Sequence, residues 1–207
     1  NNGVKVGVEG DIICLSFDGI KNITSGEGGA VITNDENIIS FVKDARLLGV
    51  EKDTEKRYEG QRSWDFDVKH QGYRYHMSNI FAAIGREQLK KINSIEKKRK
   101  EIVNYYLENL KNIPQIQTLD FDFKSIISHI FVVKTSKRDE LREFLLSKNI
   151  ECGIHYKPNH LLTKYKSDAL PITEKVYEEI LTLPCQLDLV KEEQDFVINS
   201  IKEFFNA

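Results

Sequence analysis

The sequence has little cysteine and no long apolar run. Its three cysteines, Cys14, Cys152 and Cys185, lie far apart and form no Cys-x-x-Cys pair, which excludes both a disulfide framework and a zinc ribbon. Because thiols stay reduced in the cytoplasm, we expect a cytoplasmic protein. No apolar segment approaches the length that crosses a bilayer, so we expect no membrane partner.

The sequence also lacks an excess of either charge. Lys and Arg number 30 and Asp and Glu number 32, so the formal net charge is −2. This balance excludes the broad basic surface of nucleic-acid-binding proteins. With 207 residues, of which 40% are hydrophobic, the chain is long enough to bury a core in one large or two small domains.

Apolar runs bounded by glycine stand out in the first part of the chain. They predict buried strands over residues 11–17 and 29–33. Asp35 follows as the N-cap of an amphipathic helix that Gly49 ends. Strand and helix thus alternate, which favours an α/β layer. The polar segment 50–75 has no period and is long for a connection, which is typical of functional or interface loops.

A long amphipathic helix is expected next. Ser78 is placed to cap it, and apolar residues recur every three or four positions up to Leu110, before Pro114. A continuous helix to Lys111 would be about 50 Å long at roughly 1.5 Å per residue, and it would bend or link two domains. The alternative is two ordinary helices, broken near the charged stretch 96–100.

The remainder is predicted to be a compact α/β unit. Strands are expected over residues 116–119, 130–135 and 150–156. Ser136, with Asp139 three residues later, predicts a capping box for one helix. Thr173 is a candidate cap for the next, whose apolar positions are Val176 and Ile180. A last helix carries on one side the apolar residues Val197, Ile201, Phe204 and Phe205.

Residues 16–35 hold the most informative chemistry. A serine hydroxyl ends the first strand, Lys21 follows in the loop, and a Gly-rich turn lets a ligand approach the backbone. Burial of a loop lysine lowers its pKa and makes the amine a nucleophile able to form a Schiff base. Most loop lysines are solvated, however, and most Gly-rich turns are only turns, so composition alone favours the structural interpretation.

Other chemistries are disfavoured. Cys152, His155 and His160 have side chains that suit zinc, but three residues at irregular spacing make a poor site. No Walker A sequence occurs, and the turn GEGG is not the GxGxxG of a dinucleotide fold. Ser16 lacks the nearby His and Asp arrangement of a hydrolase triad.

The segment SFDGIKNITSGEGGAVITND at residues 16–35 resembles the cofactor-lysine motif of the DegT/DnrJ/EryC1/StrS family of pyridoxal-phosphate-dependent sugar aminotransferases. The resemblance implies that Lys21 forms the internal aldimine with pyridoxal 5'-phosphate and that Ser16 hydrogen-bonds the cofactor phosphate. The loop would be shaped by Asn22, Glu27, Gly28 and Gly29.

The segment GYRYHMSNIFAAIGREQL at residues 72–89 is similar to the family's GYNYRMS motif and the helix after it. In the family this loop crosses a homodimer interface, which implies that Arg74 approaches the phosphate of the partner subunit's cofactor. Arg74 and His76 stand where the commonest family pattern has Asn and Arg. An arginine pairs with phosphate more strongly than an amide does. The alternative is that Arg74 is an ordinary surface charge.

The segment IECGIHYKPNH at residues 150–160 resembles the HY.P.H element of the family's small domain. The resemblance implies that His155, Tyr156 and His160 bind substrate at the mouth of the active site. A hydrogen-bonded structural histidine is the alternative interpretation of His155.

The resemblance covers essentially the whole sequence and implies the C-terminal part of the α/β fold-type I, or aspartate aminotransferase-like, fold. Residues 1–95 would be the remaining part of the large cofactor-binding domain and residues 96–207 the small domain, with the long helix linking them. The implied enzyme moves an amino group from glutamate to a nucleotide-linked keto-deoxy sugar, at C4 of a dTDP-sugar by family frequency. The amino sugar that it forms would be used to build lipopolysaccharide O-antigen, other polysaccharides or glycosides.

The family's phosphate-binding turn, stacking aromatic and ring-nitrogen aspartate are not visible in residues 1–10, and Asn1 stands where an initiator methionine is usual. We therefore expect the C-terminal portion of a homodimeric enzyme, inactive as an isolated fragment. The alternative is a non-catalytic remnant that folds and binds through the same dimer surface. The presence of Lys21 and Ser16 favours the enzyme.

Overall fold

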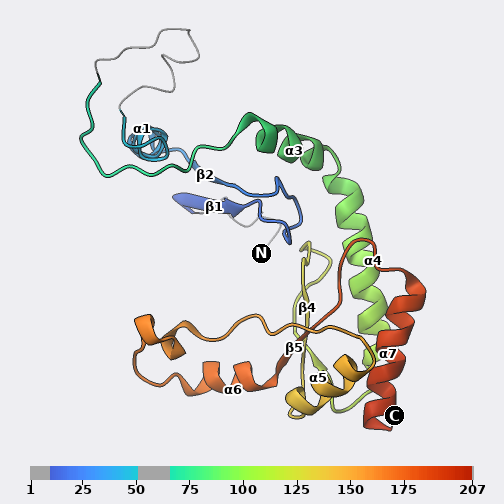
Figure 1. Cartoon of the computed structure of the whole chain (residues 1–207). Coiled ribbons are helices and arrows are strands. Elements are labelled where there is room, and N and C mark those ends of the chain that lie inside the picture. Colours follow the sequence, from blue (N-terminus) through green and yellow to red (C-terminus); the bar gives the residue numbers. More distant parts are fainter. Residues whose placement is uncertain (1–9, 51–65, 207) are drawn as a thin grey trace. The chain divides into compact units, whose positions relative to one another are not determined.

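The computed structural model describes residues 10–50 and 66–206 (Figure 1). Two compact units are present, Asn1–Lys91 and Ile92–Ala207. The expectations for residues 1–9 and for most of the polar segment 50–75 lie outside the described residues. The sequence placed the division between residues 95 and 96, close to the observed one, and the identity of each unit as a domain of a larger fold stays a prediction.

A β-hairpin forms the centre of the first unit. Strands β1 (Ile12–Ser16) and β2 (Gly29–Thr33) pair antiparallel, with Ser16 opposite Gly29. The apolar runs predicted both strands, and both are present. They are not the buried strands expected, because most residues of β1 and β2 are exposed. Helix α1 (Glu36–Ala45) follows, and the Asp35 side chain caps it by accepting hydrogen bonds from the backbone N–H groups of Asn37 and Ile38 at 2.8 and 3.3 Å.

Two helices replace the single long helix that the periodicity allowed. Ser78 caps α3 (Asn79–Lys90) by accepting from the Phe81 N–H at 3.2 Å, and α4 (Ile92–Leu110) begins after one intervening residue. The break lies at Lys91, whose N–H bonds the carbonyl of Gln88 and so tightens the last turn of α3. The charged stretch 96–100 is uninterrupted helix, so the predicted position of the break was wrong.

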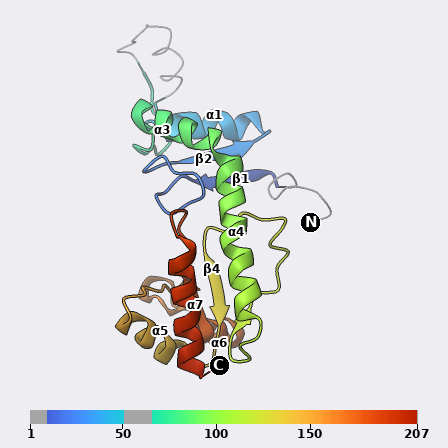
Figure 2. The ribbon, with the colours of Figure 1, turned by 90° about the vertical axis from the view of Figure 1, so that its right-hand side faces the viewer.

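The second unit contains a three-stranded antiparallel sheet in the order β3-β4-β5, formed by Gln117–Thr118, Phe131–Lys134 and Ile180–Leu183. Helices α4, α5 (Arg138–Ser147) and α7 (Lys191–Phe205) contribute to one apolar cluster with β4 and β5. Figure 2 shows α4 and α7 beside β4. The completely buried side chains of this cluster are Tyr106, Leu110, Phe131, Val133, Leu141, Leu145, Leu181 and Ile201.

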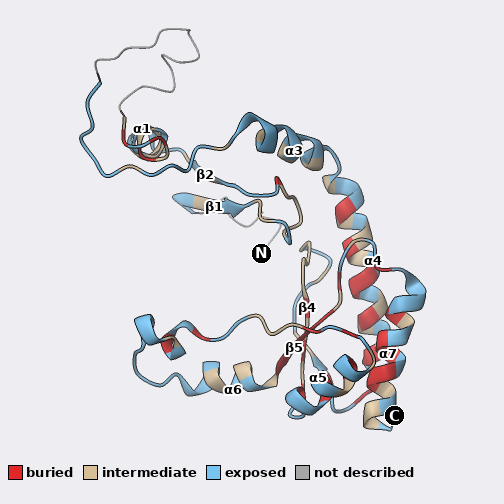
Figure 3. Ribbon diagram, in the orientation of Figure 1, coloured by how far each residue is buried: buried red, intermediate tan, exposed pale blue. Residues whose placement is uncertain are grey.

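The two units differ in how much of their apolar surface is covered. Buried residues gather on α4, α7, β4 and β5, whereas β1 and α3 expose most of their side chains (Figure 3). Helix α3 contains no buried residue, and Ile80 on it is 72% exposed. The core of the described chain therefore lies in the second unit.

Strand β5 is the element that the sequence analysis missed. It follows α6 (Pro171–Glu179) directly, and all four of its residues are buried. The periodicity assigned Ile180 to the preceding helix, because a buried strand has no polar alternation to mark it. The short 3₁₀ turns Asn159–Leu161 and Thr163–Tyr165 precede α6.

Three other local predictions were wrong. Residues 150–156 form no strand; only Gly153 bridges β5, opposite Thr182. Helix α5 begins after Lys137 without a side-chain cap, so Ser136 caps nothing. Helix α6 begins after Leu170 with Pro171 in its first turn, a position proline favours, which places Thr173 inside the helix. Among the described residues, no helix combines the length and apolar character needed to cross a membrane.

Candidate functional site

The loop that carries Lys21 is closed by backbone hydrogen bonds. At its ends the Phe17 N–H donates to the Gly28 carbonyl at 2.9 Å, and the Ser25 N–H donates to the Phe17 carbonyl at 2.9 Å. Inside it, Asp18 organises a turn, because its side chain accepts from the Ile20 N–H at 3.1 Å and its carbonyl from the Lys21 N–H at 3.1 Å. Lys21 therefore lies on a fixed turn and is half-buried.

Ser16 lies at the entrance to this loop, as the last residue of β1. Its hydroxyl oxygen accepts from the Asp18 N–H at 3.4 Å, so the hydroxyl hydrogen is still able to donate. The side chain is exposed. A hydroxyl that ends a strand beside a lysine loop is suited to donate to an anionic ligand.

Two hydroxyls that the sequence analysis passed over hold the loop from inside. Thr24 donates to the Phe17 carbonyl at 3.2 Å and accepts from the Gly26 N–H at 2.9 Å. Ser25 is completely buried and donates to the Glu27 carbonyl at 2.7 Å. The one signal for them was a pair of hydroxyl residues immediately before a Gly-rich turn.

The glycine turn is required by close packing. A Cβ on Gly28, whose φ is +144°, would lie 2.4 Å from Met77 Cε and 2.9 Å from Ser25 Oγ. A Cβ on Gly29 would lie 2.7 Å from the carbonyl oxygen of Leu15. The approach to α3 thus packs on the lysine loop through Met77, so the segments around residues 28 and 77 support each other.

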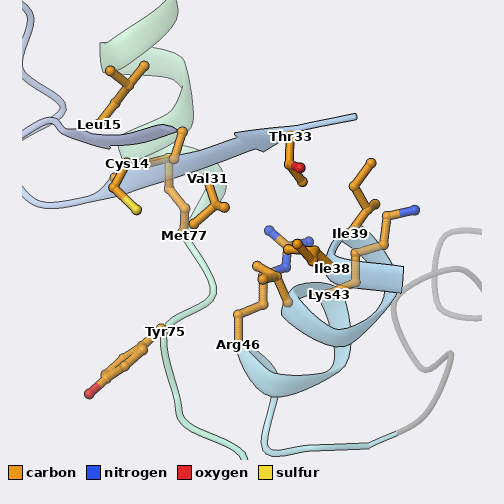
Figure 4. A pocket seen from close by; sticks show the side chains of 13 residues that line it. Cys14, Leu15, Val31, Thr33, Ile38, Ile39, Lys43, Arg46, Tyr75 and Met77 are labelled. Atoms are coloured by element: carbon orange, nitrogen blue, oxygen red, sulfur yellow. The ribbon is translucent and has the colours of Figure 1, made fainter. Parts of the chain in front are cut away.

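A hollow of about 580 Å³ lies between the hairpin and α1 (Figure 4). Its wall is mainly apolar, with Lys43 and Arg46 from α1 and its end. Neither Ser16 nor Lys21 lines it. Gly29 and Met77 place the hollow next to the end of the lysine loop. The complete set of lining residues is Cys14, Leu15, Gly29, Ala30, Val31, Thr33, Ile38, Ile39, Val42, Lys43, Arg46, Tyr75 and Met77.

Arg74 lies on an extended segment that runs along the end of α1. Its backbone bridges Leu47, and on either side the N–H groups of Tyr73 and Tyr75 donate to the carbonyls of Ala45 and Arg46 at 2.6 and 2.9 Å. The rings of Tyr73 and Tyr75 stack with centroids 5.0 Å apart. Arg74 is exposed and lies in sequence between Tyr73 and Tyr75, whose side chains are also exposed.

His155 is held on the sheet of the second unit. Its Nδ1 lies 2.9 Å from the hydroxyl of Thr182 on β5. Tyr156 is 62% exposed, and its ring meets the His155 ring edge to face at 4.7 Å between centroids. The structure therefore brings His155 and Tyr156 together, with the tyrosine reaching into solvent.

His160 belongs to a different contact. It is buried, and its Nε2 lies 2.9 Å from Glu174 Oε1 on α6. The same carboxylate oxygen accepts from the Leu170 N–H at 2.9 Å. The hydrogen bonds from His160 and then from Leu170 lower the pKa of Glu174. This pair connects the short turn at residue 160 to the start of α6.

The described residues contain no group of three His, Cys, Asp or Glu side chains able to hold a metal ion. Cys152 and Cys185 are buried free thiols, and Cys14 is exposed. Burial raises the pKa of Cys152 to about 12 and raises that of Cys185 as well. Both buried thiols are therefore protonated and poor nucleophiles near neutral pH.

A sequence model of the DegT/DnrJ/EryC1/StrS aminotransferase family matches residues 1–202. The chain belongs to this family. It is similar to the UDP-4-amino-4,6-dideoxy-N-acetyl-beta-L-altrosamine transaminase of Campylobacter jejuni (serotype O:2), with 31% identity over 95% of this chain and 53% of that protein. The chain thus spans about half the length of the curated relatives it matches.

Solved structures of the family show the same fold. The Helicobacter pylori aminotransferase PseC, involved in the biosynthesis of pseudoaminic acid, matches with a TM-score of 0.86 and 26% identity, over 100% of this chain and 56% of that one. The protein Spr1654 of Streptococcus pneumoniae, solved in its PLP-form, matches with a TM-score of 0.83 and 26% identity, over 99% of this chain and 54% of that one. The expected C-terminal portion of the pyridoxal-phosphate transferase fold is confirmed.

Pyridoxal phosphate is the cofactor of this family, and the described residues fit it. The lysine loop offers an amine on a fixed, half-buried turn, and the Ser16 hydroxyl at its entrance has a hydrogen left to donate. The turn at Gly28 packs against Met77 and Ser25, which leaves no room for a side chain there. An amine and a hydroxyl so placed suit the aldehyde and the phosphate of one cofactor molecule.

Proposed function

We propose that this chain carries the lysine loop and substrate entrance of a pyridoxal-phosphate-dependent sugar aminotransferase. The observation that carries the proposal is the position of Lys21. It lies on a turn in a loop that a backbone hydrogen bond closes between Phe17 and Gly28, and the Ser16 hydroxyl lies at the start of that loop. Family membership supports it, because the relatives named above are transaminases.

The roles follow from the chemistry of the side chains. Lys21 Nζ would hold the cofactor, and as a free amine it would move a proton to and from the reacting carbon. Ser16 donates a hydrogen bond to the phosphate and orients it. When bound, pyridoxal phosphate supplies the electron sink that stabilises a carbanion at that carbon. The loop itself supplies position, because its hydrogen bonds limit where Nζ can reach.

The substrates proposed are glutamate as amino donor and a nucleotide-linked keto-deoxy sugar as acceptor. The name of the Campylobacter relative specifies a UDP-linked 4-amino-4,6-dideoxy sugar, which supports amination at C4. The resemblance to the family favours a dTDP-linked sugar, because such substrates are frequent in it. A panel of substrates must therefore distinguish UDP-linked from dTDP-linked sugars. His155 and Tyr156 would meet the acceptor at the entrance, and His160 would support the entrance through Glu174.

We further propose a cytoplasmic homodimer that serves polysaccharide, lipopolysaccharide or glycoside biosynthesis. Three free cysteines suit a reducing compartment. Tyr73 and Tyr75, 48% and 74% exposed, flank Arg74, and exposed aromatic and arginine side chains are typical of interfaces. Arg74 would then pair with the phosphate in the partner subunit. Light scattering on the protein expressed from its complete gene should give a dimer mass, and a monomer at working concentration would contradict this assembly.

The activity is tested with ¹⁵N-glutamate, pyridoxal phosphate and a panel of UDP- and dTDP-linked 4-keto and 3-keto sugars. We expect 2-oxoglutarate to form and ¹⁵N to appear at C4 of one acceptor. Lys21→Arg keeps the charge but removes the nucleophilic amine and should abolish transfer. Lys43→Arg, an exposed lysine of α1, is the matched control. Transfer that survives in Lys21→Arg, or no transfer to any keto sugar, would contradict the proposal.

A further inference from the structure

We propose that Thr182 is a positioning residue that fixes the orientation and the tautomer of His155, so that His155 presents its Nε2–H group as a hydrogen-bond donor. The role in catalysis rests on the proposed function, in which His155 meets the sugar nucleotide. The geometry itself does not depend on that function. It is formed by three residues of the second unit: Gly153, His155 and Thr182.

The backbone places the two partners within reach. Gly153 pairs with Thr182 through two hydrogen bonds: the Gly153 N–H donates to the Thr182 carbonyl at 3.0 Å, and the Thr182 N–H donates to the Gly153 carbonyl at 2.8 Å. His155 follows shortly after this pair, and its Nδ1 lies 2.9 Å from Thr182 Oγ1. The strand therefore fixes the distance between the hydroxyl and the ring.

Gly153 leaves the space that the imidazole ring of His155 occupies. A Cβ on Gly153 would lie 2.5 Å from His155 Cε1, 3.1 Å from Nδ1 and 3.4 Å from Nε2. All three ring atoms thus lie over the bare Cα of the glycine. Any larger residue would push the imidazole away from the sheet, and with it from the hydroxyl.

Thr182 is the one polar residue of strand β5. Its neighbours Leu181 and Leu183 belong to the apolar cluster, and side chains alternate along a strand, so Thr182 projects from the opposite face. It is only 7% exposed. A buried hydroxyl requires a partner, and within the part of the chain that the structure describes the partner found is His155 Nδ1.

Because His155 Nδ1 is the partner found for the buried Thr182 hydroxyl, one direction of the hydrogen bond between them is favoured. A threonine hydroxyl has one hydrogen to donate, and Nδ1 is the acceptor within its reach. The hydroxyl donates, so Nδ1 is the unprotonated nitrogen and Nε2 carries the hydrogen of the neutral ring. Nε2 has no partner among the described residues. It is left to donate to an oxygen of the substrate, such as a diphosphate or sugar oxygen.

The tautomer is tested by ¹⁵N NMR of the imidazole nitrogens in the intact 207-residue chain, at alkaline pH, where imidazole rings are neutral. The chain has five histidines, and His155→Gln assigns the signals. We expect the Nε2–H tautomer of His155 to dominate in the wild type and in Thr182→Ser. Thr182→Val is isosteric but cannot donate, and it should give a mixture of tautomers. A dominant Nδ1–H tautomer in the wild type, or an unchanged spectrum in Thr182→Val, would overturn the proposal.

The catalytic consequence is tested in the enzyme expressed from its complete gene. Thr182→Val should raise KM for the sugar nucleotide roughly tenfold, the effect of one lost hydrogen bond, and leave the glutamate half-reaction unchanged. Thr182→Ser should restore the wild-type value. An equal loss in both half-reactions would indicate a merely structural role and would contradict positioning. If no enzyme activity exists at all, the proposed function fails while the NMR result still decides the role of Thr182.

Folding is the control for both arms. Circular dichroism of Thr182→Val should match the wild type, because valine keeps the branched shape that packs on β5. Gly153→Ala is the second variant, and it displaces the ring while keeping the hydroxyl. It should give the same tautomer mixture as Thr182→Val. A wild-type tautomer in a folded Gly153→Ala would show that the ring position does not depend on the glycine, and it would overturn that part of the account.

Discussion

The hydroxyl of Ser25 donates to the carbonyl of Glu27 across 2.7 Å and closes the turn that follows Lys21. Ser25 is completely buried, and its N–H is bound in turn to the Phe17 carbonyl at 2.9 Å. One residue thus joins both limbs of the loop. The position of the lysine amine therefore depends on a side chain that has no chemical role of its own.

Ser25→Ala should make the lysine loop less rigid without unfolding it. Loss of the hydroxyl removes one buried hydrogen bond, which costs about 1 kcal/mol of unfolding free energy. We expect a small decrease in the urea midpoint and slower covalent labelling of Lys21 by pyridoxal phosphate. Ser40→Ala, an exposed serine of α1, is the control. Identical labelling rates in the two variants would show that Ser25 does not position the loop.

Gly28→Ala should be much more damaging than Gly19→Ala, although both add one methyl group to the same loop. At Gly28 the new Cβ meets Met77 Cε at 2.4 Å and Ser25 Oγ at 2.9 Å, with φ at +144°, whereas at Gly19 nothing lies within 4 Å. The strained backbone alone costs about 2 kcal/mol. Urea unfolding measures the difference. Equal stabilities would mean that the turn does not need its glycine.

Leu181→Ala should destabilise the second unit by about 2–5 kcal/mol, because it leaves a cavity in the apolar cluster. Leu181 is completely buried in β5, whereas Leu146 on α5 is 54% exposed. Leu146→Ala is therefore the matched control, with an expected change below about 0.5 kcal/mol. Chemical unfolding followed by circular dichroism compares them. A similar loss in both variants would place the core elsewhere.

The His160–Glu174 contact should make stability depend on acid pH. The folded-state pKa of Glu174 is lower than the ordinary value of 4.5, so the contact contributes stability above that pH. The contribution is lost as the pH falls through the lowered pKa. In Glu174→Gln the difference in stability from the wild type should therefore shrink between pH 6 and pH 3. Glu178→Gln, an exposed carboxylate of α6, controls for net charge. A constant difference across this range would exclude the contact as the cause.

Some elements with local signals were predictable from the sequence, although the cap signals at Ser136 and Thr173 were not borne out. Asp35 marks the start of α1 and Ser78 the start of α3, because a cap acts on the residues next to it. Strand β5 was missed because Ile180–Leu183 is buried on both faces and follows a helix without a turn. The break at Lys91 was misplaced because no glycine or proline marks it.

The residues of the candidate site also differ in whether a local sequence signal marks them. Lys21 and Ser16 could be proposed from the sequence because they belong to a contiguous motif. Thr182 was not found, because its partner His155 is 27 residues away in sequence and only the pairing of Gly153 with β5 brings them together. Tertiary pairing of this kind has no signature in a single sequence. His160 was named for its motif, and its bond to Glu174 became visible only with the start of α6 in place.

The identity of the covalent lysine is the central claim, and borohydride trapping tests it most directly. The protein expressed from its complete gene is incubated with pyridoxal phosphate, reduced, digested and mapped by mass spectrometry. Reduction converts the C=N bond between the lysine Nζ and the cofactor's aldehyde carbon into a stable amine. We predict one pyridoxyl group per chain on Lys21, and none in folded Lys21→Arg. A folded wild-type protein with no label on Lys21, or with label spread over exposed lysines such as Lys43, would contradict the account.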